Sequence, residues 1–146
     1  MIERTIHTFT VREKPTYVAG PLSDPNTATQ IWNVGVASVV ALDLIRAGHL
    51  VYLPHLCQYL EYQQNGSLGW QFWMDYDLEW LRRCGRVVRI PGESKGADIE
   101  VDTALAIGMR VYWWDDAEDW RELMTMYADP ALPGEQLAAA SGALQG

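Results

Sequence analysis

The sequence predicts a three-layer α/β domain in which a mainly parallel sheet carries helices on both faces. Short runs rich in β-branched and aromatic residues alternate with longer apolar stretches, so the order strand–helix repeats along the chain. Most of the short runs are followed by glycine or proline, residues that end strands and open loops. Because parallel strands need a crossover helix between them, this alternation favours a parallel sheet of the flavodoxin-like or Rossmann-like kind.

The boundaries of the elements follow from the same pattern. The expected strands are residues 16–19, 49–53, 86–90 and 110–114, with a short additional strand at 5–11. The expected helices are residues 27–47, 70–84, 98–107 and 120–127, the last with Asp116 or Glu118 near its start. Gly48 and Gly108 each follow a helix, where glycine is the usual C-terminal stop. Residues 56–69, which contain the turn Asn65-Gly66, are expected to form a partly helical lid.

Length and composition indicate one domain. The chain has 146 residues, of which 49% are hydrophobic, and this is enough for a single sizeable core. We expect residues 1–128 to form that domain. In residues 129–146 alanine, glycine, proline and glutamine dominate, so we expect a mobile C-terminal tail.

Charge and hydropathy narrow the classes of partner. The net charge is −8 and the isoelectric point is near 4.7, which argues against binding a nucleic-acid polymer, because that affinity comes from neutralising phosphates. A single nucleoside or nucleotide remains compatible with an acidic protein. No uncharged apolar run approaches the ~18 residues of a membrane span, and the first residues lack the apolar core of a signal peptide. We therefore expect a cytoplasmic chain with no membrane partner.

The two cysteines do not indicate a disulfide framework or a metal centre. Cys57 and Cys84 are too few for the first. His55-Leu-Cys57 has the residue types of half a metal site, but no second His/Cys pair stands at ligand spacing. Cys84 ends an apolar helical stretch, where a core position is expected. We expect no metal and no cofactor.

Asp77 is the first candidate site residue, because it falls on the apolar side of helix 70–84. At helical spacing that side carries Trp70, Trp73, Met74, Trp80, Leu81 and Cys84. The charged residues Asp75, Glu79 and Arg82 fall on the opposite side. A carboxylate turned inward is costly unless it is paired, hydrogen-bonded or lining a cavity. Asp77 is therefore either a structural hydrogen-bond acceptor or helix cap, or part of a site.

Glu100 is the second candidate. It follows the strand 86–90 and a turn-rich loop, and we expect it in the first turn of the next helix. In open α/β sheets ligands bind at the carboxyl ends of the strands. A purely structural capping box would need Gly96 or Ala97 as the cap, and neither has a side-chain oxygen. Two inward carboxylates on successive helices indicate an acid/base or nucleophile pair.

Three short motifs resemble those of the nucleoside 2-deoxyribosyltransferase superfamily. They are Tyr17-Val-Ala-Gly-Pro21, Asp77-Leu78 and Ser94-Lys-Gly-Ala-Asp-Ile-Glu100, in the order and at spacings compatible with that family over about residues 15–114. The run Asp77-Leu-Glu-Trp-Leu81 is most similar to the branch that hydrolyses 2'-deoxynucleoside 5'-monophosphates. The loop Pro91-Gly-Glu-Ser-Lys-Gly-Ala97 instead resembles bacterial and phage members known only as deoxyribosyltransferase-like.

This resemblance implies roles for the candidate residues. Glu100 would be the nucleophile that traps the sugar, Asp77 the general acid/base at the leaving base, and Tyr17 a hydrogen-bond donor that holds the nucleophile or the sugar. Gly20 and Pro21 would let the loop backbone approach the ligand, with a plain strand-to-helix turn as the alternative. His55 either contacts the base or is a solvent-exposed loop residue.

Ser94 separates two branches of that family. The resemblance implies an aspartate at this position in the nucleoside transferases and a serine in the monophosphate hydrolases. Ser94 and Gly96 beside a helix N-terminus form a plausible phosphate nest, but Glu93 and Asp98 flank it and would repel a dianion. The loop after the first strand also lacks an arginine. We therefore expect deoxyribosyl transfer between nucleobases, with monophosphate hydrolysis as the alternative and a non-catalytic nucleotide-binding module as a second alternative.

The number of tryptophans predicts self-association. Seven tryptophans in 146 residues exceed what one small core easily hides, and exposed aromatic patches commonly mark interfaces. We expect a homodimer or higher oligomer, with helices 27–47 and 70–84 as the contact surfaces. The alternative is a monomer in which the lid 56–69 covers those rings.

Overall fold

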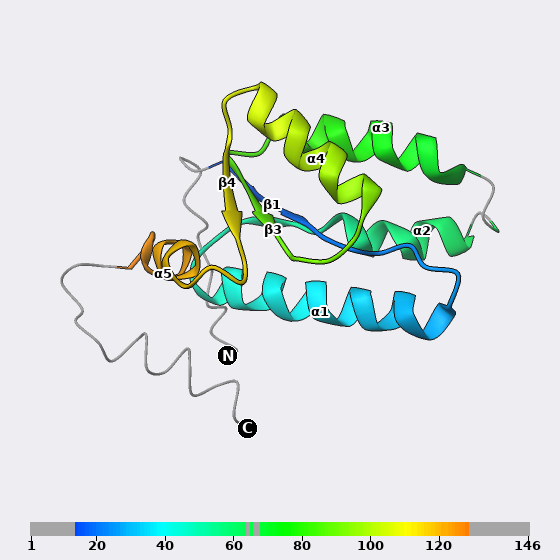
Figure 1. Cartoon of the computed structure of the whole chain (residues 1–146), viewed down its shortest axis with the longest axis horizontal. Coiled ribbons are helices and arrows are strands. Elements are labelled where there is room, and N and C mark those ends of the chain that lie inside the picture. The colour runs from blue at the N-terminus through cyan, green and yellow to red at the C-terminus, as the bar shows by residue number, and fades with distance from the viewer. Residues whose placement is uncertain (1–13, 64, 66–67, 129–146) are drawn as a thin grey trace, which may run out of the picture.

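The structure is a computed structural model that describes residues 14–63, 65 and 68–128 (Figure 1). It holds a parallel four-stranded sheet in the order β2-β1-β3-β4. The strands are β1 (Thr16–Ala19), β2 (Val51–Tyr52), β3 (Arg86–Arg89) and β4 (Arg110–Trp113). The predicted parallel α/β fold is confirmed. The expected strand 5–11 and the expected tail 129–146 lie outside the described residues.

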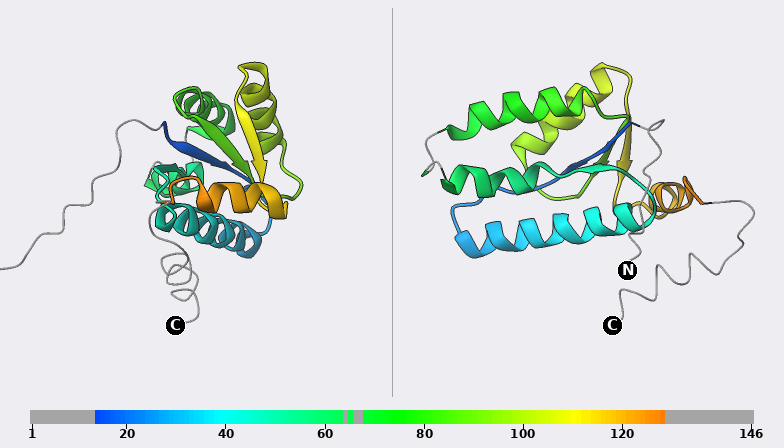
Figure 2. Two further views of the ribbon diagram at one scale, coloured as in Figure 1. Left: turned by 90° about the vertical axis from the view of Figure 1, so that its left-hand side faces the viewer. Right: turned by 180° about the vertical axis from the view of Figure 1, so that it is seen from behind.

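Helices cover both faces of the sheet (Figures 1 and 2). One face carries α1 (Thr27–Arg46) and α5 (Ala117–Thr125). The other carries α3 (Gly69–Leu81) and α4 (Lys95–Ala106). A 3-10 turn, η1 (Pro54–Leu56), leads from β2 into α2 (Cys57–Gln63), so the expected lid is partly helical.

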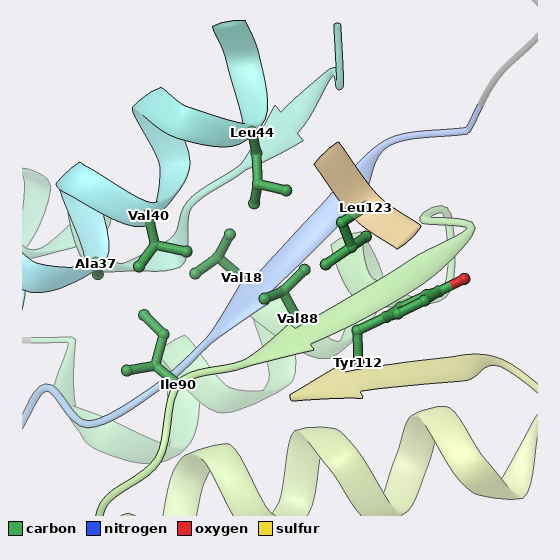
Figure 3. Close-up of a cluster of buried hydrophobic side chains, with 8 residues drawn as sticks. All are labelled: Val18, Ala37, Val40, Leu44, Val88, Ile90, Tyr112 and Leu123. Atoms are coloured by element: carbon green, nitrogen blue, oxygen red, sulfur yellow. The ribbon is translucent and has the colours of Figure 1, made fainter. Parts of the chain in front are cut away.

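The alternation of side chains along the strands divides the core into two clusters. On the α1 side, Val18 of β1 and Val88 of β3 meet α1 and α5 (Figure 3). On the α3 side, Tyr17 and Val87, one position earlier on each strand, meet α3 and α4. Successive strand residues point to opposite faces, so a strand buried on both faces reads as a continuous apolar run.

α1 is as long and as apolar as a membrane-spanning helix. By length and composition alone it could cross a bilayer, although the sequence had been expected to contain no such stretch. It packs Ala37, Val40 and Leu44 against the sheet (Figure 3), as the core helix of an α/β domain does.

Three helix boundaries differ from the sequence expectation by three residues: the end of α3 and the starts of α4 and α5, the last at Ala117 rather than at residue 120. α3 ends at Leu81 rather than at residue 84. α4 begins at Lys95 rather than near residue 98, because Ser94 caps it by accepting a hydrogen bond from the backbone N–H of Ala97 at 3.1 Å. Glu100 therefore lies in the second turn of α4, and the expected first-turn position was wrong. α5 is capped by Asp116, one of the two residues expected near its start.

The strand order contains a topological switch point beside β1. The connection through α1 carries the chain from β1 to β2 on one face, and the connection through α3 returns it to β3 on the other face (Figure 1). At such a point the loops after neighbouring strands diverge and leave a crevice at their carboxyl ends. Here those loops follow β1 and β3.

Candidate active site

A cavity of about 570 Å³ opens at the carboxyl ends of the strands, and both candidate carboxylates line it. Asp77 comes from α3 and Glu100 from α4, while Gly20 and His55 come from the loops after β1 and β2. Asp77 and Glu100 are 8% and 6% exposed, so both side chains point inward as the sequence predicted. The structure thus brings the two acids of successive helices to one cavity.

Tyr17 holds Glu100 from inside the protein. The Tyr17 hydroxyl donates a 2.6 Å hydrogen bond to Oε1 of Glu100. Tyr17 is fully buried on β1 and is itself not part of the cavity wall. Of the two roles expected for this tyrosine, the geometry therefore fits contact with the glutamate and not direct contact with a ligand.

The surroundings of Glu100 disfavour its ionised form. Burial raises the pKa of the Glu100 carboxyl to about 8. The Tyr17 hydrogen bond and the guanidinium of Arg89 act in the opposite direction, whereas the negative charge of Asp77 raises the pKa further. Glu100 and Asp77 are thus close enough to influence each other's protonation, and their titration belongs to the pair.

Tyr52 holds Asp77 in a similar way, and sequence reasoning missed it. Its hydroxyl donates to Oδ1 of Asp77 at 3.2 Å and lies 3.6 Å from Sγ of Cys57. Burial raises the pKa of Asp77 to about 7, against the lowering effect of the Tyr52 hydrogen bond. Tyr52 sits in the short strand β2 in register with Tyr17, and the sequence carries no signal that pairs it with Asp77.

The Tyr52 ring is fixed between two other aromatic rings. It stacks on Trp80 with centroids 5.0 Å apart and an interplanar angle of 15°, and it lies 5.5 Å from the Tyr17 ring. Trp80 was expected in the buried stripe of its helix but is 40% exposed, because it covers the tyrosine at the edge of the sheet. Trp70, also expected in that stripe, is 45% exposed and lines the cavity.

Ser94, at the end of the loop after β3, and Lys95 and Gly96, at the start of α4, line the cavity. Ser94 is the N-cap of α4, so its hydroxyl oxygen already accepts one hydrogen bond and keeps its proton for donation. At Gly96 a Cβ atom would lie 3.2 Å from the sulfur of Met74, so the glycine lets α3 and α4 pack closely beside the cavity. The ammonium of Lys95 lies over the Trp70 ring, 5.3 Å from its centroid.

Arg89 anchors this loop from beneath and was not singled out in the sequence. It is 3% exposed and donates to the backbone carbonyls of Ile90 and Gly92 and, at 2.9 Å, to Oδ1 of Asp98. Its guanidinium is also a cation near Glu100. A buried arginine with these partners fixes the start of α4, and with it the position of Glu100.

His55 is buried, so its interpretation as an exposed loop residue was wrong. It is 2% exposed, and its Nε2–H donates to the carbonyl of Pro21 at 3.1 Å. Burial lowers the pKa of the imidazole, which is therefore neutral. Its Nδ1 has no hydrogen-bond partner within the described part of the chain. Because Nε2 carries the proton, Nδ1 is a buried acceptor in a residue that borders the cavity.

Gly20 and Pro21 allow the loop after β1 to pack closely against the end of β3 and the loop that follows it. A Cβ at Gly20 would lie 3.0 Å from Cβ of Ile90, so the backbone after β1 passes close to the end of β3. Gly20 lines the cavity, whereas Pro21 packs against Gly92 and offers its carbonyl to His55. The expected ligand contact thus fits Gly20 but not the Pro21 side chain.

The remaining wall comes from α2, the start of α3 and the loop after β1, which contributes Leu22, Ser23 and Asp24. Trp73 of α3 donates its indole N–H to Oε2 of Glu61, which ties α2 to α3 across the mouth of the cavity. Cys57 and Gln58 complete that side. Among residues 14–63, 65 and 68–128, no group of three His, Cys, Asp or Glu side chains is arranged to hold a metal ion. Cys84 is buried in the core, as expected.

Comparison with known proteins assigns no family to this chain. No protein-family model matches the sequence, and no curated protein matches it. The cavity offers two buried carboxyls of raised pKa, each held by a tyrosine hydroxyl, together with donors at the start of α4. Such a pair can supply one proton donor and one oxygen nucleophile to a small ligand.

Proposed function

We propose that the protein cleaves the N-glycosidic bond of 2'-deoxynucleosides and transfers the sugar to another nucleobase. The observation that carries the proposal is the pair of buried carboxyls, Glu100 with Tyr17 and Asp77 with Tyr52, in one cavity. The three motifs that resemble nucleoside 2-deoxyribosyltransferases contribute Tyr17, Asp77 and Glu100 to this same arrangement. The cavity volume of about 570 Å³ suits a nucleoside.

In the first half of the reaction Glu100 attacks the sugar. A carboxylate oxygen of Glu100 forms a bond to C1' as the bond from C1' to the base nitrogen breaks, and the bonding pair goes to the base. Protonated Asp77 gives its proton to the departing base, so the base leaves neutral. The transition state resembles an oxocarbenium ion, and the nearby carboxylate stabilises its positive charge.

The second half reverses these steps with a different base. A nitrogen of the incoming base attacks C1', the ester bond to Glu100 breaks, and the carboxylate is restored. The ionised Asp77 accepts the proton that the incoming base loses, so the pair returns to its starting state. Tyr17 stays hydrogen-bonded to Glu100 throughout and stabilises the carboxylate whenever it is free.

The raised pKa values fit a pair that shares one proton. With pKa values of about 7 and about 8, Asp77 and Glu100 are seldom both ionised near neutral pH. Because Glu100 has the higher pKa, most free molecules with one proton carry it on Glu100, and the form that reacts, with the proton on Asp77 and the charge on Glu100, is the minor one. The Tyr17 hydrogen bond and the Arg89 cation both favour charge on Glu100.

A second candidate function is hydrolysis of 2'-deoxynucleoside 5'-monophosphates. Ser94, Lys95 and Gly96 line the cavity at the N-terminus of α4, where a phosphate would find donors and a cation. Against it stands Glu93, which lines the same wall and would repel the dianion. In this reaction water replaces the incoming base and gives its proton to Asp77.

One incubation separates the candidates. The protein is mixed with a deoxynucleoside and a different free base, or with a deoxynucleoside monophosphate, and the products are separated by chromatography. We expect a new nucleoside from the first mixture. Free base released from the monophosphate without a new nucleoside would favour the hydrolase, and unchanged substrates in every mixture would favour a module that only binds nucleotides.

A further inference from the structure

The outward side of α1 presents an apolar surface that the described chain leaves uncovered. Ile31 and Trp32 are 66% and 72% exposed, and Val39 is 52% exposed. These residues border an open groove of about 510 Å³, here named the α1 groove. It is lined by Ala28, Ile31, Trp32, Gly35, Val36, Val39 and Trp114. Exposed apolar surface of this kind marks an interaction site.

The α1 groove is electrically neutral although the protein is strongly acidic. Residues 25–42 contain no charged side chain, whereas the whole chain carries a net charge of −8. In a symmetric dimer a surface faces a copy of itself, so any charge on it meets the same charge. A neutral patch is therefore the surface on which two copies of an acidic chain can meet without local repulsion.

Gly35 lies in the middle of this surface, and nothing in the described part of the chain requires a glycine there. Its φ is not positive, and a Cβ added to it would meet no atom within 4 Å. Glycine inside a helix is unfavourable relative to alanine. A helix from a second molecule that approaches closely at this point would account for the missing side chain.

The residues around Gly35 are arranged to suit contact with themselves. Ile31, Gly35 and Val39 are spaced four residues apart, so they form one ridge along α1 with the glycine at its centre. When two such ridges cross at their centres, Ile31 of one copy lies against Val39 of the other. Crossing of i±4 ridges at about −50° is the commonest way in which helices pack.

We propose that two copies of this chain associate through the α1 groove, with the two α1 helices crossing at Gly35. The two-fold axis passes between the two Gly35 residues, and Trp32 of each copy covers apolar surface of the other. This refines the expectation that both α1 and α3 form the interface. The two helices cover opposite faces of the sheet (Figure 2), so one two-fold contact cannot use both, and the Trp70 and Trp73 side chains of α3 line the cavity.

The oligomeric state of the full chain tests the proposal. Light scattering coupled to size exclusion, at tens of micromolar protein, is expected to give twice the chain mass of 16.5 kDa. Trp32→Glu is expected to be monomeric, with the mass of a single chain, because the glutamate would be buried against apolar surface of the second copy. Leu105→Glu is the matched control, since Leu105 is 58% exposed on α4 on the other face of the sheet, and it should leave the dimer intact.

Gly35→Ala is a second, milder test, because an added methyl group would meet no atom of the described chain. Alanine favours the helix, so the melting temperature of the dilute monomer should rise. The same methyl group should weaken association, with a dissociation constant raised roughly tenfold or more. Opposite effects on stability and association are expected only if a second helix crosses at this position.

Three results would overturn the proposal. The first is a wild-type chain that stays monomeric at high concentration. The second is a dimer that Trp32→Glu and Gly35→Ala leave unchanged. The third is a monomer that sediments with vesicles of neutral lipid, because α1 would then contact a membrane surface rather than a second copy.

Discussion

Tyr17 and Tyr52 are register partners on adjacent parallel strands, with ring centroids 5.5 Å apart, and each donates a hydrogen bond to a different buried carboxyl. Tyr17 holds Glu100 of α4, and Tyr52 holds Asp77 of α3. The pairing of Tyr17 with Tyr52 therefore helps to position both acids, although the acids lie on two separate helices. This relationship suggests experiments on each member of the two pairs.

Replacement of Glu100 by Gln should reduce transfer to below a few per cent of the wild-type rate while preserving the fold. The amide cannot form the bond to C1', but its oxygen can still accept the hydrogen bond from Tyr17. The measurement is turnover of a deoxynucleoside with a second base, followed by chromatography. Glu93→Gln is the matched control, because Glu93 lines the same cavity but is exposed. Substantial activity in Glu100→Gln would remove Glu100 from the nucleophile role.

Replacement of Asp77 by Asn should slow the reaction by roughly 10²–10⁴-fold for substrates whose base must be protonated to leave. A substrate with a better leaving group should lose much less. Rates for two such substrates, compared in the variant and in Asp75→Asn on the exposed side of α3, give the measurement. Equal losses for both substrates would assign Asp77 a structural role.

Activity should depend on pH as a bell, with its maximum between the pKa values of about 7 and about 8. Tyr52→Phe removes the hydrogen bond that lowers the pKa of Asp77, so Asp77 should keep its proton to higher pH. Because Asp77 has the lower of the two pKa values, the acidic limb of kcat/KM is expected to move upward in this variant. Tyr17→Phe should instead move the alkaline limb upward, because Glu100 has the higher pKa and would ionise only at still higher pH. A merely structural tyrosine would lower the rate without moving either limb.

The buried acids should also make stability depend on pH. Burial raises the pKa of Glu100 in the folded chain, while in the unfolded chain the carboxyl has its ordinary pKa of about 4.3. The folded chain therefore holds a proton that the unfolded chain releases. The resulting stability is fully present below about pH 4 and is lost progressively as pH rises through about 8.

Glu100→Gln isolates this effect, because glutamine does not titrate. The free energy of unfolding of the variant minus that of the wild type, measured with urea from mildly acidic to mildly alkaline pH, is expected to rise with pH. Glu93→Gln should show no such trend. A constant difference for Glu100→Gln would mean that the carboxyl is ionised in the folded chain across this range.

The sequence predicted the parts of the fold that depend on local patterns. The alternation of strands and helices, the inward direction of Asp77 and the burial of Glu100 all follow from periodicity, and all are confirmed. The start of α4 was wrong because the cap was sought next to Glu100, whereas Ser94 accepts from Ala97 at the true boundary. Ser94 is visible in the sequence as a possible cap, three residues before Ala97. Only the hydrogen bond in the structure shows that it, and not a later residue, caps α4.

Contacts between distant segments could not be predicted in the same way. Tyr52 reaches Asp77 across 25 positions, and His55 reaches the carbonyl of Pro21 across 34. Neither contact leaves a periodic pattern in the sequence, because both contacts depend on how the segments after β1 and β2 come together in space. The exposure of Trp80 has the same origin, since its ring covers Tyr52 at the sheet edge rather than the core beneath α3.

The most direct test of the central claim is mass spectrometry of the protein after brief exposure to a deoxynucleoside without an acceptor base. The account predicts a mass increase of one deoxyribosyl group, located by proteolysis on the peptide that contains Glu100 and absent from the Glu100→Gln variant. Addition of a free base should remove the adduct and yield the new nucleoside. Turnover of the nucleoside with no adduct on that peptide under quenched conditions, or with the adduct on another residue, would contradict the account.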